Sequence, residues 1–452
     1  MEGLNKYQAY PEYRDSGVEW IDAIPFHWEV LPTFSLCEAS TKKNIDGAEN
    51  NVLSLSYGNI IPRDIETNFG LLPESFNTYQ LVENGDIILR LTDLQNDKNS
   101  LRVGLVKQKG IITSAYLKLS SQGSMLSEYL YRLLHSYDTT KVFYGMGGGL
   151  RQSMKFEDFR RLPLLLPSKN EQGKIIDFLD HETAKIDNLI EKQQQLIELL
   201  KEKRQAVISH AVTKGLNPDV PMKDSGIEWL GEVPEHWLCT KLKYIVALTP
   251  RKSLINYKFN DKCTFIPMEK LKRNSLITDM RKFIREVING YTYFEDNDLL
   301  LAKVTPCFEN KNIAVAKGLL NGMGFGSTEI YVLRPTENVR AYYLLYRLLE
   351  DNFILAATGA MTGAGGLKRV PSDFLLNYPV AIPPKSEMDE IVNYLNEQEA
   401  RYDVIENNTS LAIHLLQERR TALISAAVTG KIDLRNWTAP IPEAETPTEA
   451  SA

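Results

Sequence analysis

The sequence predicts an α+β protein in which two globular domains are joined by two long antiparallel helices, which form an intramolecular coiled coil and give the chain pseudo-two-fold symmetry. Three observations predict this architecture: an internal duplication, short β-type runs in each half, and two long heptad stretches without proline. The chain has 452 residues, of which 43% are hydrophobic and 24% charged. This is an ordinary globular composition, and the length suffices for several domains that each bury a core.

The duplication appears as segments of the first half that recur, in the same order, in the second half. The offset between copies rises steadily from 209 to 216 residues, as a duplication with a few small insertions predicts. The paired segments are 15–20 and 224–229; Pro25, His27 and Trp28 with Pro234, His236 and Trp237; 84–89 and 296–301; 131–134 and 346–349; 163–167 and 379–383; and 208–213 and 424–429.

Each half begins with a tryptophan-containing segment and continues into short β-type runs broken by Gly, Asn, Asp and Pro. In the first half these runs are 52–55, 86–89, 111–112 and 116–119, which predict a twisted, partly buried sheet. A short helix follows, around 127–136 and 341–349, and then a glycine-rich loop at 145–149 and 363–366. A strand bounded by prolines leads from that loop into a long helix.

The long helices are predicted at about 171–213 and 387–429, with apolar residues spaced alternately four and three apart. That spacing is typical of a coiled coil, and a one-sided apolar stripe of this length needs a partner. We therefore expect the two helices to pair with each other, antiparallel. The expected seam consists of Ile175, Leu179, Ile186, Leu189, Leu196, Leu200 and Val207 with Ile391, Leu395, Tyr402, Ile405, Ala412, Leu416 and Leu423.

Composition and motifs exclude several classes of function. The net charge of −6 excludes a uniformly basic nucleic-acid coat but allows a local basic groove. No apolar stretch approaches the roughly 18 residues of a membrane span, and the four scattered cysteines predict free thiols in a reducing cytoplasm. The sequence lacks GxxxxGK[ST], HExxH, GxSxG and the Asn/Asp-Pro-Pro-aromatic motif of amino-methyltransferases. We predict no catalytic residue, cofactor site or metal site, and a cytoplasmic protein.

The arrangement resembles the specificity (S) subunit of type I restriction–modification systems. The resemblance depends on segments that occur in both halves and on one pattern in the second half, and it covers nearly the whole chain. The second copy has Ser386-Glu387-Met388 in place of the Glu-Gln helix start, which leaves the helix intact. The segments are 163–172 and 203–208, their partners 379–384 and 419–424, and the run 301–310 followed by 324–329.

The resemblance implies that residues 1–168 and 217–385 are target recognition domains, each reading one half of a split, asymmetric DNA sequence. Residues 169–216 and 386–430 would be helical spacers that fix the gap between the half-sites, and 431–452 a largely disordered tail. The expected partners are double-stranded DNA, two DNA methyltransferase subunits and restriction or motor subunits. S-adenosylmethionine, ATP and Mg²⁺ would be used by those other subunits in adenine methylation or DNA cleavage, and the chain itself would be non-catalytic.

Candidate DNA contacts come from basic side chains and from the glycine-rich loops. Residues 239–319 contain 15 Lys and Arg against 8 Asp and Glu, a local excess of positive charge suited to phosphates. The alternatives are an ordinary solvated surface and, for the loops, a flexible turn. The candidates are Arg90, Arg102, Lys107, Lys109, Gly148, Arg151, Gln152, Lys155, Lys270, Lys272, Arg273, Arg281, Lys282, Arg285, Lys303, Lys368 and Arg369.

Two other functions stay open at this point: a coiled-coil adaptor that binds only proteins, and, with less support from the motifs, a self-sufficient DNA-modifying enzyme. His27 and His236, each beside a tryptophan, are interpreted as residues that pack or that hydrogen-bond to the backbone, with a DNA contact as the alternative.

Overall fold

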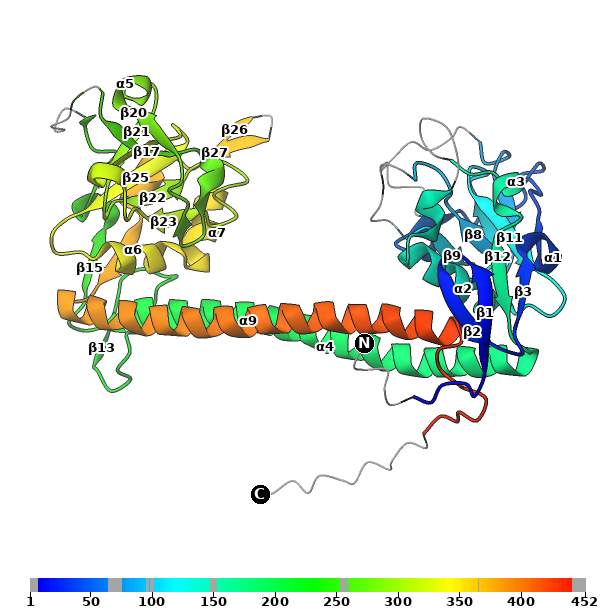
Figure 1. Cartoon of the computed structure of the whole chain (residues 1–452). Helices are drawn as coiled ribbons and strands as arrows, with labels where there is room; N and C mark the ends of the chain where they lie inside the picture. Colours follow the sequence, from blue (N-terminus) through cyan, green and yellow to red (C-terminus); the bar gives the residue numbers. More distant parts are fainter. Residues whose placement is uncertain are drawn as a thin grey trace, which may run out of the picture. The chain divides into compact units, whose positions relative to one another are not determined.

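The computed structural model describes residues 7–63, 75–94, 97, 101–146, 153–252, 258, 260–364 and 366–440. The chain forms two compact units: unit 1 comprises Met1–Gln194 and Leu411–Ala452, and unit 2 comprises Gln195–Ser410. Helices α4 (Lys169–Lys214) and α9 (Lys385–Val428) confirm the two predicted long helices, and each contributes one half to each unit (Figure 1). The domain boundaries predicted from the sequence, which set the helices apart from the domains, stay a prediction.

Unit 1 is built on an antiparallel sheet of order β4-β11-β8-β9, covered by helix α2, whose buried face includes Tyr129 and Leu133. Two-stranded pairs β1-β2, β3-β12, β5-β6 and β7-β10 surround it. The elements before α4 are β1 (Tyr13–Val18), β2 (Ile21–Pro25), β3 (Glu29–Pro32), α1 (Thr33–Leu36), β4 (Cys37–Ala39), β5 (Leu53–Ser56), β6 (Asn59–Pro62), β7 (Gln80–Val82), β8 (Ile87–Leu89), β9 (Val103–Leu105), β10 (Gly110–Ile112), β11 (Leu117–Ser121), α2 (Ser127–Thr139), α3 (Phe156–Phe159) and β12 (Pro163–Leu166).

Unit 2 contains the matching sheet, of order β16-β25-β22-β23, and a second four-stranded sheet, of order β20-β17-β24-β21, in which β17 and β24 are parallel. Its elements before α9 are β13 (Met222–Asp224), β14 (Glu232–Pro234), β15 (Leu238–Lys241), β16 (Val246–Leu248), β17 (Lys262–Ile266), β18 (Leu271–Lys272), β19 (Ser275–Leu276), β20 (Arg281–Phe283), α5 (Ile284–Val287), β21 (Thr292–Glu295), β22 (Leu299–Ala302), β23 (Ile313–Val315), β24 (Met323–Gly326), β25 (Ile330–Pro335), α6 (Ala341–Leu348), α7 (Asp351–Gly359), β26 (Thr362–Ala364), β27 (Leu367–Arg369), α8 (Ser372–Asn377) and β28 (Pro379–Ile382).

The two units repeat the same strand pairings, with an offset of 212 residues between Leu89 and Leu301 and of 210 between Val103 and Ile313. Strand β8 pairs with β9 so that Leu89 faces Val103, and β22 pairs with β23 so that Leu301 faces Ile313. In the same way the proline-bounded strand β12 pairs with β3, and β28 pairs with β15. The structure therefore confirms the duplication, because each unit contains one copy of these strand pairings.

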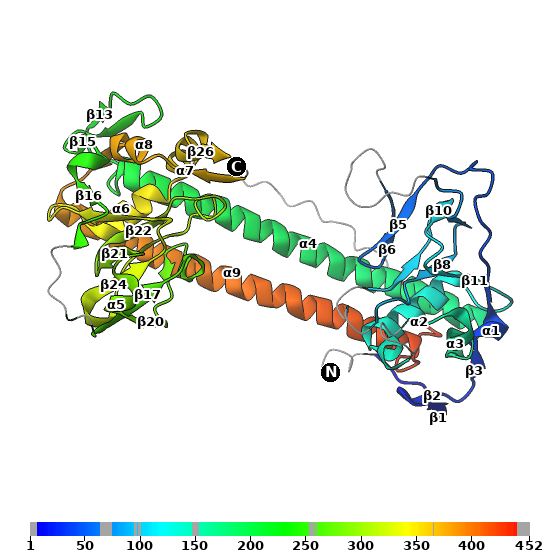
Figure 2. The same ribbon diagram turned by 90° about the horizontal axis from the view of Figure 1, so that it is seen from above.

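Halves of α4 and α9 lie side by side in each unit, as Figure 2 shows. In unit 1 the Arg420 guanidinium binds Asp187, with 2.9 Å between Nε and Oδ1. In unit 2 Arg204 binds Asp403, with 2.5 Å between Nη2 and Oδ1. Each of these ion pairs joins the N-terminal half of one helix to the C-terminal half of the other, which requires antiparallel pairing in both units.

The predicted apolar seam is buried only near the helix ends. Ile175, Leu179, Ile186 and Leu423 are buried in unit 1, and Ile391, Leu395 and Tyr402 in unit 2. Leu200, Val207, Ala412 and Leu416 are half-buried. Leu189, Leu196 and Ile405, nearer the helix centres, are 38–47% exposed. Within each unit the globular part, rather than the other helix alone, covers most of the buried stripe.

A hydrogen-bonded node ties the N-terminal part of each unit to the first turn of a long helix. In unit 1 Glu171 accepts a hydrogen bond from Trp28 Nε1 at 3.4 Å and lies 2.8 Å from His27 Nε2. In unit 2 Glu387 lies 3.1 Å from Trp237 Nε1 and 2.7 Å from His236 Nε2. Both histidines therefore have the hydrogen-bonding role that the sequence suggested, although their acceptors are carboxylates rather than backbone groups.

The end of the chain completes the core of unit 1. Beyond α9, Ile432 and Leu434 are only 2% exposed, and the amide of Asp433 donates to the carbonyl of Gln8 at 2.8 Å. The prediction of a disordered tail is thus wrong for its first residues, because they carry apolar side chains that unit 1 buries. Residues 441–452 lie outside the described part of the chain.

Candidate nucleic-acid interface

Three of the predicted basic residues meet at one place in unit 2. The loop that follows β22 begins with Lys303, and its carbonyl accepts a hydrogen bond from the amide of Val370 at 2.9 Å. Thr305 then bonds to the strand that carries Lys368, with 3.0 Å from the Thr305 amide to the Lys368 carbonyl. Lys303, Lys368 and Arg369 are thereby brought together from segments some sixty residues apart. We name this set of residues, with Glu329, junction 2.

Unit 1 contains the equivalent junction. The amide of Met154 donates to the carbonyl of Leu91 at 2.9 Å, which joins the loop after β8 to the segment after the glycine-rich loop. Arg90 and the exposed Lys155 flank this contact, and we name them junction 1. Gly148, Arg151 and Gln152 belong to the same predicted loop and lie outside the described residues.

The second glycine-rich segment forms a hairpin, β26-β27, where the sequence indicated an open loop. Gly363 faces Lys368 in this ladder, and its φ of +145° places it in a region of backbone conformation that other residues rarely adopt. The side chains of the described hairpin residues are exposed, including the apolar Leu367. Figure 1 shows the hairpin, β20 and α5 on the side of unit 2 away from α4 and α9.

The prediction that Arg102 contacts DNA is wrong. Its side chain is fully buried, and the guanidinium donates to the carbonyls of Arg90, Thr92, Asp93 and Asp97 and to the hydroxyl of Tyr144. A buried arginine of this kind organises the loop that follows β8 and presents no charge to a ligand. The sequence could not reveal this, because the acceptors are backbone carbonyls.

Lys107 and Lys109 are exposed, but they lie beyond the other end of the β8·β9 ladder from Arg90. Lys107 lines a cavity of about 700 Å³ together with Glu128, Asp180 and Asp187, and Lys109 lies 3.7 Å from Glu49. Arg132 and Arg420 line the same cavity and bind Asp180 and Asp187. The structure does not bring Lys107 and Lys109 to junction 1.

The basic segment around residue 280 divides into two groups. Arg273 binds Glu399 of α9, and Lys270 binds Asp279, while Lys272 beside them is exposed. Arg281, Lys282 and Arg285 lie instead on β20 and α5 among aromatic rings: Lys282 Nζ is 4.1 Å from the centre of the Phe265 ring, and the Arg285 guanidinium is 4.8 Å from that of Phe283. Arg273 thus binds helix α9, whereas β20 and α5 carry the exposed Arg281 and Arg285 on the same side of unit 2 as the hairpin.

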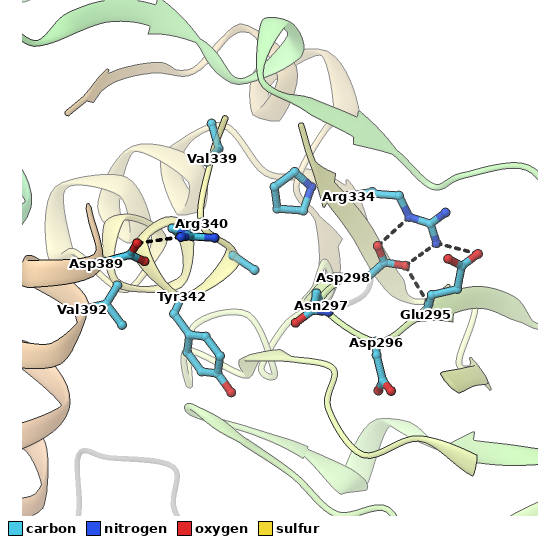
Figure 3. Close-up of a pocket in the computed structure, with 12 residues that line it drawn as sticks. Glu295, Asp296, Asn297, Asp298, Arg334, Val339, Arg340, Tyr342, Asp389 and Val392 are labelled. Atoms are coloured by element: carbon cyan, nitrogen blue, oxygen red, sulfur yellow. Dashed lines mark hydrogen bonds and ion pairs between the residues drawn. The ribbon is translucent and has the colours of Figure 1, made fainter. Parts of the chain in front are cut away.

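Charged residues make up half of the lining of one cavity of unit 2. Figure 3 shows this cavity, of about 420 Å³, where Arg334 binds both carboxylate oxygens of Asp298 at 2.7 Å and Arg340 binds Asp389 at 2.6 Å. Glu295 lies 3.1 Å from Arg334, and Asp296 also lines the cavity, so its lining carries four carboxylates and two guanidinium groups. In the described part of the chain no set of His, Cys, Asp and Glu side chains is placed to hold a metal ion, and no helix there is long and apolar enough to cross a membrane.

Two residues that were not predicted from the sequence contribute to junction 2. Glu329 holds Arg369 through two hydrogen bonds, and the ring of Tyr331 lies 5.2 Å from Lys303 Nζ. Glu329 ends the run 324–329, which belongs to the resemblance, but no spacing rule relates it to a residue forty positions away.

No protein-family model matches the chain. Among curated proteins, the EcoEI specificity subunit of Escherichia coli is 32% identical over 213 residues, which cover 46% of this chain and 35% of that protein. The EcoAI specificity subunit of E. coli is 34% identical over 40% of this chain and 32% of its own length. The chain therefore spans about a third of the length of these two relatives. The MjaVIII specificity subunit of Methanocaldococcus jannaschii is 22% identical over 79% of this chain and 81% of that protein.

Two solved structures share the fold. One, from a type I restriction–modification system, covers 90% of this chain and 99% of its own, with a TM-score of 0.67 and 15% identity. The other is the HsdS subunit of Thermoanaerobacter tengcongensis, with a TM-score of 0.51, 15% identity and coverage of 90% of this chain and 98% of that one. The chain thus resembles the specificity subunits of type I restriction enzymes in sequence and has their fold.

Proposed function

We propose that this chain is the DNA-recognition subunit of a type I restriction–modification complex and reads a split, asymmetric target with a fixed gap. Each unit acts as a target recognition domain on one half-site. The chain itself performs no chemistry and binds no cofactor. Its partners are DNA, two methyltransferase subunits and restriction or motor subunits, and those subunits use S-adenosylmethionine, ATP and Mg²⁺. We place the complex in the cytoplasm.

The observation that carries this proposal is the repetition of one junction on two copies of one scaffold, with different side chains at each. Junction 1 presents Arg90 and Lys155, and junction 2 presents Lys303, Lys368 and Arg369. Basic side chains supply phosphate affinity, while the identity and geometry of the side chains at base edges determine sequence. The basic side chains stand at different positions of the repeated scaffold, because Arg90 corresponds to Ala302 and Lys155 to Pro371. This difference favours two unequal half-sites, so the target is not a palindrome.

The helices support the docking of partner subunits. In unit 1 Leu189, Leu411 and Leu415 are 47–57% exposed, and in unit 2 Leu199 and Val404 are 59–61% exposed. Apolar side chains that remain exposed along a helix are typical of surfaces that bind other proteins. The antiparallel pairing also suits the helices to act as a ruler for the gap.

Selection from random-sequence DNA tests the proposal, with the methyltransferase subunits bound to the chain. The selected duplexes should share one asymmetric, gapped motif. An Arg90→Gln, Lys155→Gln chain should weaken recovery of one half-site, and Lys303→Gln, Lys368→Gln the other. Lys107→Gln and Lys317→Gln are matched controls, because both residues are exposed at the far end of the corresponding strand ladder.

An ungapped or palindromic motif would contradict the proposal. If Lys107→Gln weakened one half-site and the junction 1 variant did not, the recognition surface of unit 1 would lie at the other end of its sheet. Methyl transfer by the purified chain alone would instead favour a self-sufficient enzyme.

A further inference from the structure

Junction 2 contains an arginine that is already held in a fixed plane. Arg369 Nε donates to Glu329 Oε2 at 2.8 Å, and Nη2 donates to Oε1 at 2.9 Å. Both side chains are partly exposed, at 48% for Arg369 and 29% for Glu329. This bidentate contact uses the Nε–Nη2 edge of the guanidinium and leaves the Nη1–Nη2 edge for another ligand. Among the described residues, none accepts a hydrogen bond from Nη1 of Arg369.

The backbone around this pair is fixed on both sides. The amide of Lys303 donates to the carbonyl of Glu329 at 3.0 Å, and residue 369 forms a β-bridge with Val304. The next residue, Val370, is buried, and its carbonyl accepts a hydrogen bond from the Tyr331 hydroxyl at 2.8 Å. The free edge of Arg369 is therefore presented from a rigid position rather than from a mobile loop.

We propose that Arg369 reads one guanine of the second half-site, donating from Nη1 and Nη2 to its O6 and N7 atoms, with Glu329 as the positioning residue. This inference rests on the proposed function. Guanine is the base whose major-groove edge offers two adjacent acceptors, whereas adenine offers one acceptor and one donor. An arginine can only donate, so the free edge of Arg369 matches guanine and no other base.

Glu329 favours a base over a phosphate as the ligand. A carboxylate beside Arg369 cancels much of its charge and repels a phosphate, but it does not weaken the directional hydrogen bonds to an uncharged base edge. The hydrogen bond from Arg369 also holds the pKa of Glu329 below its ordinary value, so the carboxylate stays ionised. Lys303 and Lys368, beside it, are left to contact the phosphates.

The described residues of unit 1 have no equivalent of the Arg369–Glu329 pair. Val370 and Met154 make the same backbone contact in the two units, so the position of Arg369 corresponds to Ser153 in unit 1. A serine cannot span guanine in this way. Substituting Arg369 should therefore change base preference in the second half-site and leave the first unchanged. A general loss of folding would not give this result.

The test measures binding of the complex of this chain with its methyltransferase subunits to duplexes that vary one base pair at a time. Arg369→Gln should abolish the preference for guanine at one position of one half-site, a loss of about 5- to 140-fold in discrimination. Arg369→Lys keeps the charge but not the fork and should lose most of that preference. Glu329→Gln should lose part of it, and Lys317→Gln none.

A duplex with 7-deazaguanine at that position identifies the atom that is read. The wild-type complex should bind it more weakly than guanine, and the Arg369→Gln complex should bind both equally. Since both side chains are partly exposed, at 48% and 29%, thermal unfolding of the variants should stay close to that of the wild type. Equal weakening on every sequence would show a phosphate contact and overturn the inference, as would an unchanged motif. If the wild-type complex selected no gapped motif at all, the proposed function itself would fail.

Discussion

Removing the carboxylate of Glu171 should destabilise unit 1, and removing that of Glu387 should destabilise unit 2. The two losses in free energy of unfolding should differ. Glu171 is 5% exposed, and besides Trp28 and His27 it binds the hydroxyls of Tyr10, at 3.3 Å, and Ser168, at 3.0 Å. Burial alone would raise the pKa of Glu171, but its hydrogen bonds to His27, Ser168 and Trp28 lower it, so the charged form is stabilised. The side chain of Glu387 is 24% exposed.

The size of each loss in unfolding free energy depends on the hydrogen-bond donors that lose their acceptor. A hydrogen bond to a charged group contributes about 1.5–3 kcal/mol, and a buried donor without a partner costs about 1–3 kcal/mol. Glu171→Ala leaves the Trp28 indole N–H and the Tyr10 hydroxyl without their acceptor, and both residues are buried. We therefore expect the free energy of unfolding of unit 1 to fall by about 3–5 kcal/mol. Glu387→Ala leaves the Trp237 indole N–H without its acceptor and should lower the free energy of unfolding of unit 2 by about 2 kcal/mol.

Hydrogen–deuterium exchange of peptides 20–32 and 229–241 measures these losses unit by unit. In Glu171→Ala the first peptide should exchange at least about 100-fold faster and the second should not change, and the reverse, with a smaller factor, should hold for Glu387→Ala. Asp177→Ala and Glu390→Ala, at exposed positions near the starts of the same helices, are the controls. If either substitution changed exchange in both peptides equally, or in neither, the proposal that Glu171 and Glu387 each stabilise their own unit would be refuted.

Three further predictions concern other parts of the chain. Arg102→Met should leave four backbone carbonyls without their shared donor and destabilise unit 1 by about 3–5 kcal/mol, measured by urea unfolding. Burial, with Arg420 and Arg132 nearby, lowers the pKa of His135 from 6.5 to about 4, so the unfolded chain binds more protons between these pH values, and stability should fall as pH drops through this window. His135→Phe should remove up to about 3 kcal/mol of that dependence, and the exposed His414→Phe should not, in unfolding curves from pH 7 to 4. Inserting seven residues into both α4 and α9 should lengthen the methylated motif's gap by about three base pairs; an unchanged gap would contradict the ruler.

The sequence predicted the features that depend on repetition and periodicity. The duplicated segments and the heptad spacing located both long helices to within two residues, and the short apolar runs located β5, β8, β10 and β11. These features are local, or are written twice, and so can be found without knowing what packs against what.

The features that depend on tertiary contacts could not be predicted. Arg102 is an internal residue because backbone carbonyls surround it, and Arg273 differs from Arg281 because only the first lies within reach of Glu399. Ile432 and Leu434 look like part of a polar tail until the core of unit 1 is seen to cover them. The pairing of Glu329 with Arg369 belongs to the same class, since no periodic rule joins positions so far apart.

Detection of modified adenines in DNA from cells that carry this chain with its partner subunits tests the central claim most directly. The account predicts a single motif with two unequal specified ends separated by a constant run of unspecified base pairs, and a change at one end when only junction 2 is altered. A continuous or self-complementary motif, or one whose two ends change together, would contradict it.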